Sequence, residues 1–494
     1  MSQTEILAFL ADPATHGGET PQRIETHISV VFLAGDRAWK LKKAVRLPFL
    51  DFSTLEQRHA ACVNEIEVNR IAAGQLYLGV VPVTGDADGG LRLGGDGPVV
   101  EWLVEMRRFD QENLLSTLLE AGKVDRRMIQ EVAEAAWDLH RQAPIRADKG
   151  GANGLRRVIE TNAITMEGLA SLLPPARTRQ LTQQALARLD ELAPLLDERR
   201  HNGLVRRCHG DLHCGNICLY QGRPLPFDAI EFSDDFACVD TFYDLTFLLM
   251  DLDHRGHRAL ASHALNHYLD LSGDYQAVAM TPLLLSTRAT IRAHVLATMG
   301  QADAALSYLD AAEAYLRPPA PRLLAVGGLS GSGKSRMGRE LAPFMAVPGA
   351  AVVRTDALRK QIMGTPLLEK LPPQAYDGEM GRQTYAKLYD TCLELLKAGH
   401  AVVADAVFAK PEQRAAIEDV ARRAGVPFDG LWLWTEPELA AQRIEGRRAN
   451  VSDATVEVLR QQLQIDLGPM TWTKIHTGGS KDAALASGRA ALCL

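Results

Sequence analysis

The segment from Gly328 to Ser335 reads Gly-Leu-Ser-Gly-Ser-Gly-Lys-Ser and fits the pattern G-x-x-x-x-G-K-[ST] at every position. The apolar run Leu323–Val326 precedes it and a helix-compatible run follows it, which predicts a strand, a loop and a helix in that order. Glycines let backbone N–H groups curl around phosphate oxygens, and the N-terminus of the following helix adds a favourable dipole. The segment therefore predicts a nucleotide-phosphate site at the end of a buried strand.

The residues of this loop have expected roles in such a site. The Lys334 ammonium would pair with the β- and γ-phosphates of ATP, and the Ser335 hydroxyl would ligate Mg²⁺. The alternative is a glycine-rich turn that a lysine happens to follow, and the strand–loop–helix context favours the nucleotide site. The residues expected to surround the phosphates are Gly328, Ser330, Gly331, Ser332 and Gly333.

Two apolar runs after this loop lead into aspartates. Residues 401–405 are typical of a buried strand that brings the carboxylate of Asp405 toward Mg²⁺. In residues 352–359, Asp356 could accept a proton from an acceptor hydroxyl, and Arg359, one turn later, could hold an anionic substrate. Asp356 could also cap the next helix, as aspartate often does, and the two roles are compatible.

A basic cluster lies further along the chain. Arg443 and Arg447 are four residues apart on a predicted helix and so share one face. Arginine is suited to neutralising the charge of a moving phosphoryl group, so we expect Arg447 to act in catalysis and Arg443 to contact the substrate. The alternative is a solvated basic face, which is the commoner origin of a run of charges.

A proline-rich segment at residues 317–322 divides the chain. At 494 residues the chain exceeds what one hydrophobic core usually holds, and prolines suit a linker because they remove backbone donors. We expect an α+β domain over residues 1–316, with a sheet lobe at about 1–105 and a helical lobe at about 106–316. The sheet lobe has predicted strands at 28–33, 38–41, 80–84 and 99–106 and a predicted helix at 55–73. Over residues 323–494, apolar strands alternate with helices, which is typical of an α/β domain with a parallel sheet.

The first domain carries a second set of residues directed at phosphate and metal. Residues 209–216 match the skeleton H-x-D-L-x-x-x-N, in which Asp211 would act as the catalytic aspartate that positions the acceptor hydroxyl. Asn216 would reach a metal, and Asp228 comes where a second metal-binding aspartate would return after a short hairpin. Two carboxylates and one amide form an oxygen-rich set suited to Mg²⁺.

This pattern also predicts an upstream lysine on a strand that pairs with a glutamate on a helix. Lys40 lies on a predicted strand and Glu65 in the following helix, and we expect both to take part in binding ATP. Lys42 points to the same side as Lys40 because strand side chains alternate. The alternative for these lysines is a solvated strand edge.

The stretch around Asp211 also permits a zinc alternative. Adjacent Cys–His pairs do not readily present both side chains to one ion, and the sequence has no C-x-x-C. We therefore favour Mg²⁺. The donors in the zinc alternative would be Cys208, His209, His213, Cys214 and Cys218.

Several segments resemble known families. CHGDLHCGN, FDAIEF, DTFYDL and AWKLKK resemble the aminoglycoside phosphotransferase family over most of residues 25–315, and THISVVFLAGD and LPFLDFSTLEQR resemble a group in which that domain is fused to a P-loop ATPase. Residues 321–477 resemble P-loop kinases of small molecules and polynucleotide ends, including gluconate kinase-like and zeta-toxin-like enzymes, through GGLSGSGKS, RTDALR, ADAVF and RIEGRRANVSDAT. The resemblance implies a bilobal first domain with ATP between its lobes and a hinge near residues 105–107.

The first domain departs from the phosphotransferase pattern at one point. The glycine-rich G-x-G-x-x-G loop over the phosphates is absent, and Thr26–Ser29 occupies its region. The acceptor pocket of the family lies in variable helices, so antibiotic resistance does not follow from the resemblance.

The composition limits the partners. A formal net charge of −7 argues against bulk nucleic-acid or anionic-membrane binding, because both favour a basic surface. No apolar run approaches the roughly 18 residues that span a bilayer, and the first residues lack the basic start of a signal peptide. Seven cysteines without scaffold-like spacing indicate reduced thiols, so we expect a cytoplasmic protein. The sequence indicates no oligomeric state.

These patterns lead to one leading hypothesis and two competing ones. We expect an ATP-dependent phosphotransferase with two nucleotide sites that transfers the γ-phosphoryl group to hydroxyl groups of small molecules. Alternatively, only the second domain is catalytic, as an ATPase or a kinase of small molecules or polynucleotides, and the first is a ligand-binding regulator. A kinase of nucleic-acid ends is the third hypothesis, and the acidic net charge counts against it.

Overall fold

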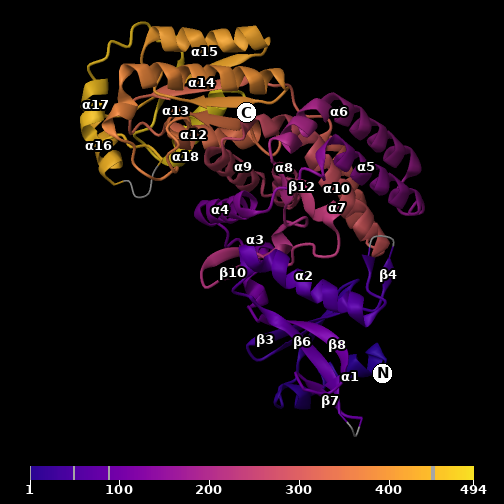
Figure 1. Cartoon of the computed structure of the whole chain (residues 1–494). Helices are drawn as coiled ribbons and strands as arrows, with labels where there is room; N and C mark the ends of the chain where they lie inside the picture. Colours follow the sequence, from indigo (N-terminus) through magenta and orange to yellow (C-terminus); the bar gives the residue numbers. More distant parts are fainter. Residues whose placement is uncertain (1, 48–49, 87–88, 447–450) are drawn as a thin grey trace. The chain divides into compact units, whose positions relative to one another are not determined.

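The computed structural model describes residues 2–47, 50–86, 89–446 and 451–494. The chain forms two compact units (Figure 1). The first unit comprises residues 1–158 and 189–248, and the second comprises residues 159–188 and 249–494. Three helices contribute residues to both units, namely α5 (Gly151–Glu167), α6 (Pro175–His201) and α8 (Thr241–His254).

An antiparallel sheet of six strands, in the order β1-β2-β3-β8-β6-β7, dominates the start of the first unit. A separate two-stranded ladder joins β4 (Arg46–Leu47) to β5 (Leu50–Asp51). The strands of the large sheet are β1 (Gln22–Glu25), β2 (Ser29–Ala34), β3 (Arg37–Lys42), β6 (Tyr77–Gly85), β7 (Leu91–Leu93) and β8 (Val99–Arg107).

Two helices cover the faces of this sheet. Helix α1 (Gln3–Ala11) packs on the face that carries Val30 and Phe32, and α2 (Leu55–Ala73) packs on the face that carries Leu33. Successive strand residues point to opposite faces, so β2 supplies side chains to both cores. Helix α2 begins at a capping box, which satisfies backbone donors of its first turn and fixes where the helix starts.

Short strands frame the segment 208–216 in the first unit. Strand β9 (Val205–Arg207) pairs with β12 (Cys238–Asp240), and β10 (Ile217–Tyr220) forms a hairpin with β11 (Arg223–Pro226). This hairpin is the short return that the sequence predicted before Asp228. The other helices of the unit are α3 (Leu115–Glu120), α4 (Arg126–Gln142) and α7 (Asp234–Ala237).

Five parallel strands, in the order β14-β15-β13-β16-β17, form the sheet of the second unit. The carboxyl ends of parallel strands meet at one edge of a sheet, which is where open α/β sheets bind ligands. Strand β13 is central and leads into the glycine-rich loop, whereas β14 is an edge strand. The strands are β13 (Leu323–Gly328), β14 (Ala351–Arg354), β15 (Val402–Asp405), β16 (Phe428–Trp434) and β17 (Thr473–His476).

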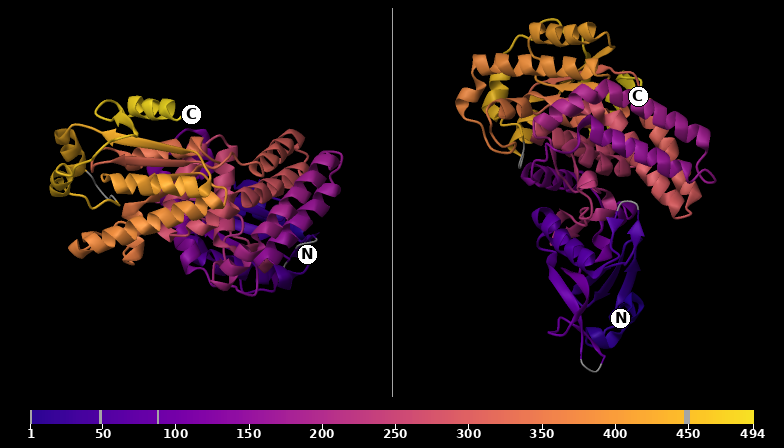
Figure 2. Two further views of the ribbon diagram at one scale, coloured as in Figure 1. Left: turned by 90° about the horizontal axis from the view of Figure 1, so that it is seen from above. Right: turned by 45° about the vertical axis from the view of Figure 1, so that its right-hand side comes forward.

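Helices cover both faces of this parallel sheet. Helices α12 (Lys334–Leu341) and α18 (Lys481–Ala491) enclose the main core on one face, and α14 (Gly378–Lys397) and α15 (Pro411–Ala424) lie on the other (Figure 2). The remaining helices of the second unit are α9 (Arg258–Ser272), α10 (Thr281–Thr298), α11 (Ala302–Tyr315), α13 (Thr355–Ile362), α16 (Pro437–Glu445) and α17 (Val456–Gln462).

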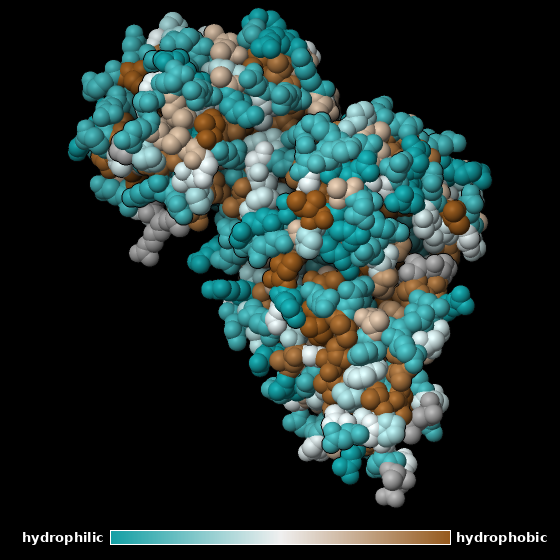
Figure 3. Space-filling view, in the orientation of Figure 1, coloured by the Kyte–Doolittle hydropathy of each residue, from teal (hydrophilic) through white to brown (hydrophobic). Residues whose placement is uncertain are grey.

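The predicted fold class, an α+β kinase-like domain followed by an α/β domain with a parallel sheet, is confirmed. The face of the molecule in Figure 3 is mainly hydrophilic, with hydrophobic residues in separate groups. Within the described ranges, the helices are all too short or too polar to cross a bilayer.

Candidate active sites

A chain of buried charges joins the sheet of the first unit to the residues after β11. Lys40, on β3, donates to Glu65 on α2, with 2.8 Å between Nζ and Oε1, and also to the carboxylate of Asp228. The Lys40 side chain is 11% exposed and that of Glu65 is fully buried. The structure thus brings together three predicted residues that are distant in the sequence, and it places Lys40 inside the unit rather than on a solvated edge.

Lys42 extends this chain from the same strand. Its ammonium contacts Glu65 and Glu231, and all three side chains are buried. Sequence reasoning singled out Lys42 but missed Glu231, for which the signal was an acidic residue three positions after Asp228. We call the resulting cluster, together with Asp211 and Asn216, the ion-pair site; its charges alternate along Asp228, Lys40, Glu65, Lys42 and Glu231.

Burial and pairing act in opposite directions on the pKa values of this cluster. Burial raises the pKa of Glu65, but the ammonium groups of Lys40 and Lys42 outweigh it and lower this pKa to about 2. For Glu231 burial dominates, and its pKa is raised. Burial lowers the pKa of Lys40, but the carboxylates of Asp228 and Glu65 hold it well above its ordinary value. Lys40 and Glu65 are therefore charged at neutral pH.

The segment 208–216 holds Asp211 near the end of this charge chain. Asn216 Nδ2 donates to Asp211 Oδ2 at 3.0 Å, and the Phe227 N–H donates to the Asn216 carbonyl at 2.9 Å, next to Asp228. The Asp211 side chain is 40% exposed, which leaves room for an acceptor molecule. His209 Nε2 lies 2.8 Å from the Phe227 carbonyl, and burial lowers the pKa of His209, so a neutral imidazole holds the loop.

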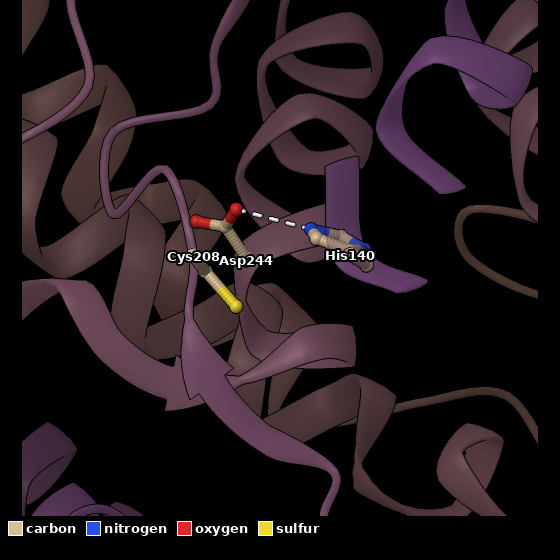
Figure 4. Close-up of side chains that lie close together, drawn as sticks. All are labelled: His140, Cys208 and Asp244. Atoms are coloured by element: carbon tan, nitrogen blue, oxygen red, sulfur yellow. Dashed lines mark hydrogen bonds and ion pairs between the residues drawn. The ribbon is translucent and has the colours of Figure 1, made fainter. Parts of the chain in front are cut away.

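Asp244 lies beside the start of this segment, and Figure 4 shows it together with His140 and Cys208. Its carboxylate accepts the N–H groups of His209 and Gly210 at 3.1 and 2.8 Å, and His140 Nε2 lies 3.1 Å from it. The Cys208 thiol donates to a backbone carbonyl, and burial raises its pKa well above the ordinary value. A protonated thiol is a poor metal ligand, so we interpret this group as a structural brace.

The zinc alternative can be compared with this geometry. Among the residues that the structure describes, the compact group of metal-donor side chains is His140, Cys208 and Asp244. Of the five donors in the zinc alternative, only Cys208 belongs to it. His213 Nδ1 accepts the N–H of Gly215 instead, at 3.0 Å.

A tight hairpin turn stands where a glycine-rich loop would cover the phosphates. The Thr26 N–H donates to the Ser29 carbonyl at 2.9 Å, and the Ser29 N–H donates to the Thr26 hydroxyl at 3.0 Å. The turn therefore joins β1 to β2 through hydrogen bonds of its own.

In the second unit, the segment from Gly328 to Ser335 forms the predicted strand–loop–helix, and Lys334 begins α12. Gly328 and Gly331 have φ values of +143° and +84°. A Cβ at these positions would lie 2.3 Å from the Leu433 carbonyl and 2.6 Å from the Ala440 carbonyl. The loop therefore requires glycine for both its backbone conformation and its close packing.

Side chains from other elements hold this loop. The Ser330 N–H donates to Gln462 Oε1 on α17 at 2.8 Å, and Lys334 Nζ donates to the Leu329 carbonyl at 3.0 Å. The Ser332 hydroxyl is buried within the loop. Gln462 was not found by sequence reasoning, because nothing in a helical glutamine signals a contact with a loop more than a hundred residues upstream.

Arg354 joins Ser335 to Asp405 at the carboxyl edge of the sheet. Its Nη2 donates to Ser335 Oγ at 3.3 Å and its Nε to Asp405 Oδ2 at 3.4 Å. Arg354 and Asp405 are neighbours in the register of β14 and β15. We call Gly328–Ser335 with Asp405 the loop site. Sequence reasoning missed Arg354, whose signal was a charged residue at the end of an apolar strand.

The remaining predicted residues occupy distinct places around the loop site. Asp356 lies in the first turn of α13, whose N-cap is Arg354, so it does not cap that helix; Arg359 lies 3.9 Å from Asp356 and over the ring of Tyr376. Arg443 donates to the Thr477 carbonyl at 2.6 Å and contacts the loop at the Gly331 carbonyl. Arg447 lies outside the described residues.

The donors of both sites fit a nucleotide with a divalent cation. In the loop site, Gly328 and Gly331 pack too closely on neighbouring backbone for a Cβ atom, and the Ser335 hydroxyl and the Asp405 carboxylate are the oxygen donors beside this loop. In the ion-pair site Asp228 and Asn216 provide the oxygens, and Lys40 provides a cation for phosphate. Oxygen donors of this kind suit Mg²⁺.

Comparison with known proteins agrees with this geometry. Residues 34–280, half of the chain, match the model described as the phosphotransferase enzyme family. The chain belongs to this family. The phosphotransferase is a kinase-type enzyme that uses ATP, as the sequence predicted. Its residues 323–465 match the model of an AAA domain, so the two predicted families are both confirmed.

Relatives of this phosphotransferase extend over both parts of the chain. An uncharacterised protein of Mycobacterium tuberculosis (strain H37Rv) is 29% identical over 475 residues, which are 93% of each chain. A thermostable mutant of an aminoglycoside phosphotransferase is 13% identical, with a TM-score of 0.40, and covers 62% of this chain and 97% of that one. A gluconokinase from Sinorhizobium meliloti is 20% identical, with a TM-score of 0.26, and covers 35% and 92%.

Proposed function

We propose that this phosphotransferase transfers the γ-phosphoryl group of ATP to hydroxyl groups of small molecules at two nucleotide sites, the ion-pair site and the loop site. The observation that carries the proposal is the ion-paired chain of Lys40, Glu65 and Asp228, next to Asp211 and Asn216. Burying charged groups costs desolvation free energy even when they are paired. A domain that had lost catalysis would have no need to keep two buried lysines held by carboxylates.

At the ion-pair site, the chain's own groups would orient both reactants. The Lys40 ammonium, fixed by Glu65, would bind phosphate oxygens. The Asp211 carboxylate would accept the proton of the acceptor hydroxyl as the new P–O bond forms and the bond to ADP breaks. A divalent metal held by Asp228 and Asn216 would neutralise phosphate charge. Asn216 Nδ2 holds the Asp211 carboxylate in place for this step.

At the loop site, backbone N–H groups and Lys334 would hold the phosphates, and Ser335 and Asp405 would hold the metal. Asp356 would accept the proton of the second acceptor, and Arg359 would bind an anionic group on it. Stacking of Arg359 on Tyr376, with 4.9 Å to the ring centroid, would orient its guanidinium. Arg443 is better suited to holding the loop than to binding substrate, because it donates to the backbone at Thr477.

The acceptors that we propose are small hydroxylated molecules. The solved relatives are named as an aminoglycoside phosphotransferase and a gluconokinase, and both names refer to hydroxylated small molecules. A net charge of −7 makes nucleic acid a poor partner. All seven cysteines are free, which is consistent with a protein that functions in a reducing compartment such as the cytoplasm.

A second candidate function is that only the loop site is catalytic and the first unit binds a regulatory ligand. The hairpin turn at Thr26 favours it, because the turn forms hydrogen bonds with itself and offers no glycine-rich cover for phosphates. The ordered ion-pair chain counts against it, since a regulator would not require a proton acceptor beside paired lysines.

The test uses the full chain with ATP, Mg²⁺ and a deproteinised metabolite extract, followed by mass spectrometry for new phosphorylated species. Asp211→Asn and Lys334→Ala variants run alongside. We expect one product to disappear with each variant. Products lost only with Lys334→Ala would favour the regulator function, and full retention of all products in both variants would contradict the proposal. A 5′-hydroxyl oligonucleotide included as an acceptor should gain no phosphate.

A further inference from the structure

Helix α9, which is labelled in Figure 1, lies against the edge strand β14, and both belong to the second unit. Helix α9 lies inside the phosphotransferase match and outside the AAA match. Ser262, Asn266 and Asp270 follow one another at intervals of four along it, so they share one face of the helix. This face makes the contacts with β14.

The first two residues of this face fix the helix to the strand. Asn266 Oδ1 accepts the Val352 N–H at 2.6 Å, and its Nδ2 donates to the Ala350 carbonyl at 3.0 Å. One side chain thus pairs with the open edge of β14 as a neighbouring strand would. A Cβ at Gly349 would lie 2.1 Å from the Ser262 hydroxyl oxygen, so α9 packs directly on the backbone before β14.

The third residue of the face holds an arginine. Asp270 Oδ2 accepts from Arg354 Nη1 at 3.0 Å and also from Arg339. The Asp270 side chain is 1% exposed and that of Arg354 is 5% exposed. From Asn266 to Asp270 the helix rises about 6 Å, and from Val352 to Arg354 the strand rises about 6.6 Å. The two contacts on α9 therefore match the spacing of their partners on β14.

The same guanidinium reaches the loop site. Arg354 donates to Ser335 Oγ and to Asp405, the two residues that would hold the metal. These two residues would hold a divalent metal that neutralises the charge of the phosphates, so Arg354 would lie beside the terminal phosphoryl group. A guanidinium has about five N–H donors, so it can keep these acceptors and still donate to a phosphoryl oxygen.

We propose that Asp270 is a positioning residue of the loop site and that it holds Arg354 where the guanidinium binds the terminal phosphoryl group of ATP. The inference rests on the proposed function of the loop site. It makes α9, a helix outside the AAA match, part of that site. Arginine selects the triphosphate over the diphosphate here, because the group that it binds is missing from ADP.

The test compares binding of Mg²⁺ with AMP-PNP and of Mg²⁺ with ADP to the full chain by calorimetry. The component of binding that Lys334→Ala abolishes belongs to the loop site. We expect Arg354→Met to weaken AMP-PNP binding at this site about 10- to 100-fold and to change ADP binding by less than about threefold, since a hydrogen bond from a charged group is lost. Asp270→Asn should lower the ratio of AMP-PNP affinity to ADP affinity at this site about 3- to 30-fold, and Asp270→Glu should partly restore this ratio.

Asp253→Asn is the matched control. Asp253 is also a buried acid of the second unit, with a side chain that is 5% exposed, and among the described residues it pairs with Arg258 and Tyr315. This variant should keep the AMP-PNP to ADP ratio of the unaltered protein. Any general cost of losing a buried carboxylate should therefore appear in both variants, and the change in ratio only in Asp270→Asn.

Three results would overturn the inference. An unchanged ratio in Arg354→Met, with the Lys334-dependent component intact, would refute it and leave the proposed function standing. Tighter binding of Mg²⁺ with AMP-PNP in Arg354→Met would also refute it, because the arginine would then compete with the metal for Ser335 and Asp405. If no binding depends on Lys334, the inference and the function of the loop site both fail.

Discussion

The ion-pair site and the loop site, as we propose them, would bind the phosphates of ATP in two different ways. In the ion-pair site the cations would be two buried lysines, both of which are paired with the buried carboxylate of Glu65. In the loop site the donors would be backbone N–H groups, in a loop whose conformation requires glycine. The first arrangement depends on long-range charge pairing, and the second on local backbone geometry.

This difference determines what each site is sensitive to. Lys40, Glu65 and Asp228 come from three segments far apart in the sequence, so the ion-pair site forms only when these segments come together. The loop site would draw its phosphate donors from eight consecutive residues. Charge and pH should therefore affect the ion-pair site, whereas added side-chain volume should affect the loop site.

The largest effect that we expect is at Asp211. Asp211→Asn removes the proton acceptor but keeps a side-chain oxygen for Asn216, so kcat at the ion-pair site should fall about 10²- to 10⁴-fold while KM for ATP changes little. The loop site should keep its activity. Steady-state kinetics on the product assigned to the first unit measure this change.

Asp138→Asn serves as the control for that prediction. Asp138 is an exposed acid of the first unit that pairs with Arg141, and its side chain is 55% exposed. Its loss should leave kcat unaltered. A fall in kcat of less than about threefold in Asp211→Asn would show that Asp211 is not the proton acceptor. That result would favour a regulatory function for the first unit.

Gly331→Ala is the corresponding change in the loop site. At φ +84° and with a Cβ only 2.6 Å from the Ala440 carbonyl, alanine forces the loop to move. We expect Lys334-dependent ATP binding to weaken about 10- to 100-fold, because displaced N–H groups lose charge-assisted hydrogen bonds. Calorimetry with AMP-PNP measures the change, and transfer at the ion-pair site should continue.

Gly364→Ala separates backbone strain from lost phosphate contacts. Gly364 lies in the same unit with φ +63°, and a Cβ there meets nothing within 4 Å. This variant should cost about 1 kcal/mol of stability and leave nucleotide binding intact. If both glycine variants weaken binding equally, strain in the unit and not the shape of the loop would be the cause.

Acid should destabilise the first unit through Glu65. Its folded pKa, about 2, lies below its ordinary value of 4.5, so its stabilising effect is present above pH 4.5 and is lost as the pH falls toward 2. Hydrogen-exchange protection factors of β3 and α2, corrected for intrinsic rates, should decrease over this range.

Glu65→Gln tests the contribution of this carboxyl group. Burial raises the pKa of Glu231, so protonation of Glu231 acts on stability in the opposite sense. The Glu65 carboxylate also raises the pKa of Glu231, so the difference between the unaltered protein and Glu65→Gln reports the loss of this carboxylate together with its effect on Glu231. An equal loss of protection in both proteins would mean that Glu65 does not cause the acid sensitivity.

The sequence predicted local structure more completely than the pairing of distant charges. The expected helix at 55–73 matches α2 (Leu55–Ala73), and the capping box of Thr54 and Gln57 fixes its start locally. The expected strand at 99–106 matches β8 (Val99–Arg107) to within one residue. The expected pair of Lys40 and Glu65 is present, but the sequence did not predict that Lys42 pairs with the same carboxylate.

What the sequence did not reveal depends on contacts between distant elements. Gln462 and Asp270 lie in no motif, and Glu231 lies in FDAIEF but had no assigned role; each gains its role from a partner that the fold brings close. The role of Asp356 as a helix cap was not observed, because Arg354 takes the N-cap position and moves Asp356 into the first turn. Periodicity determines which residues face inward but not which inward charges meet.

The smallest effect that we expect is at the hairpin turn of the first unit. Thr26→Ala removes the hydroxyl that accepts the Ser29 N–H, which should cost about 1 kcal/mol of local stability. If Lys40, held by its carboxylate partners, binds the phosphates, the turn contributes no donor to the nucleotide. KM for ATP at the ion-pair site should then rise by less than about threefold in Thr26→Ala. Lys40→Met, in contrast, should raise it far more. A tenfold rise in Thr26→Ala would show that the turn covers the nucleotide after all, and that this site also relies on local backbone geometry rather than on paired charges alone.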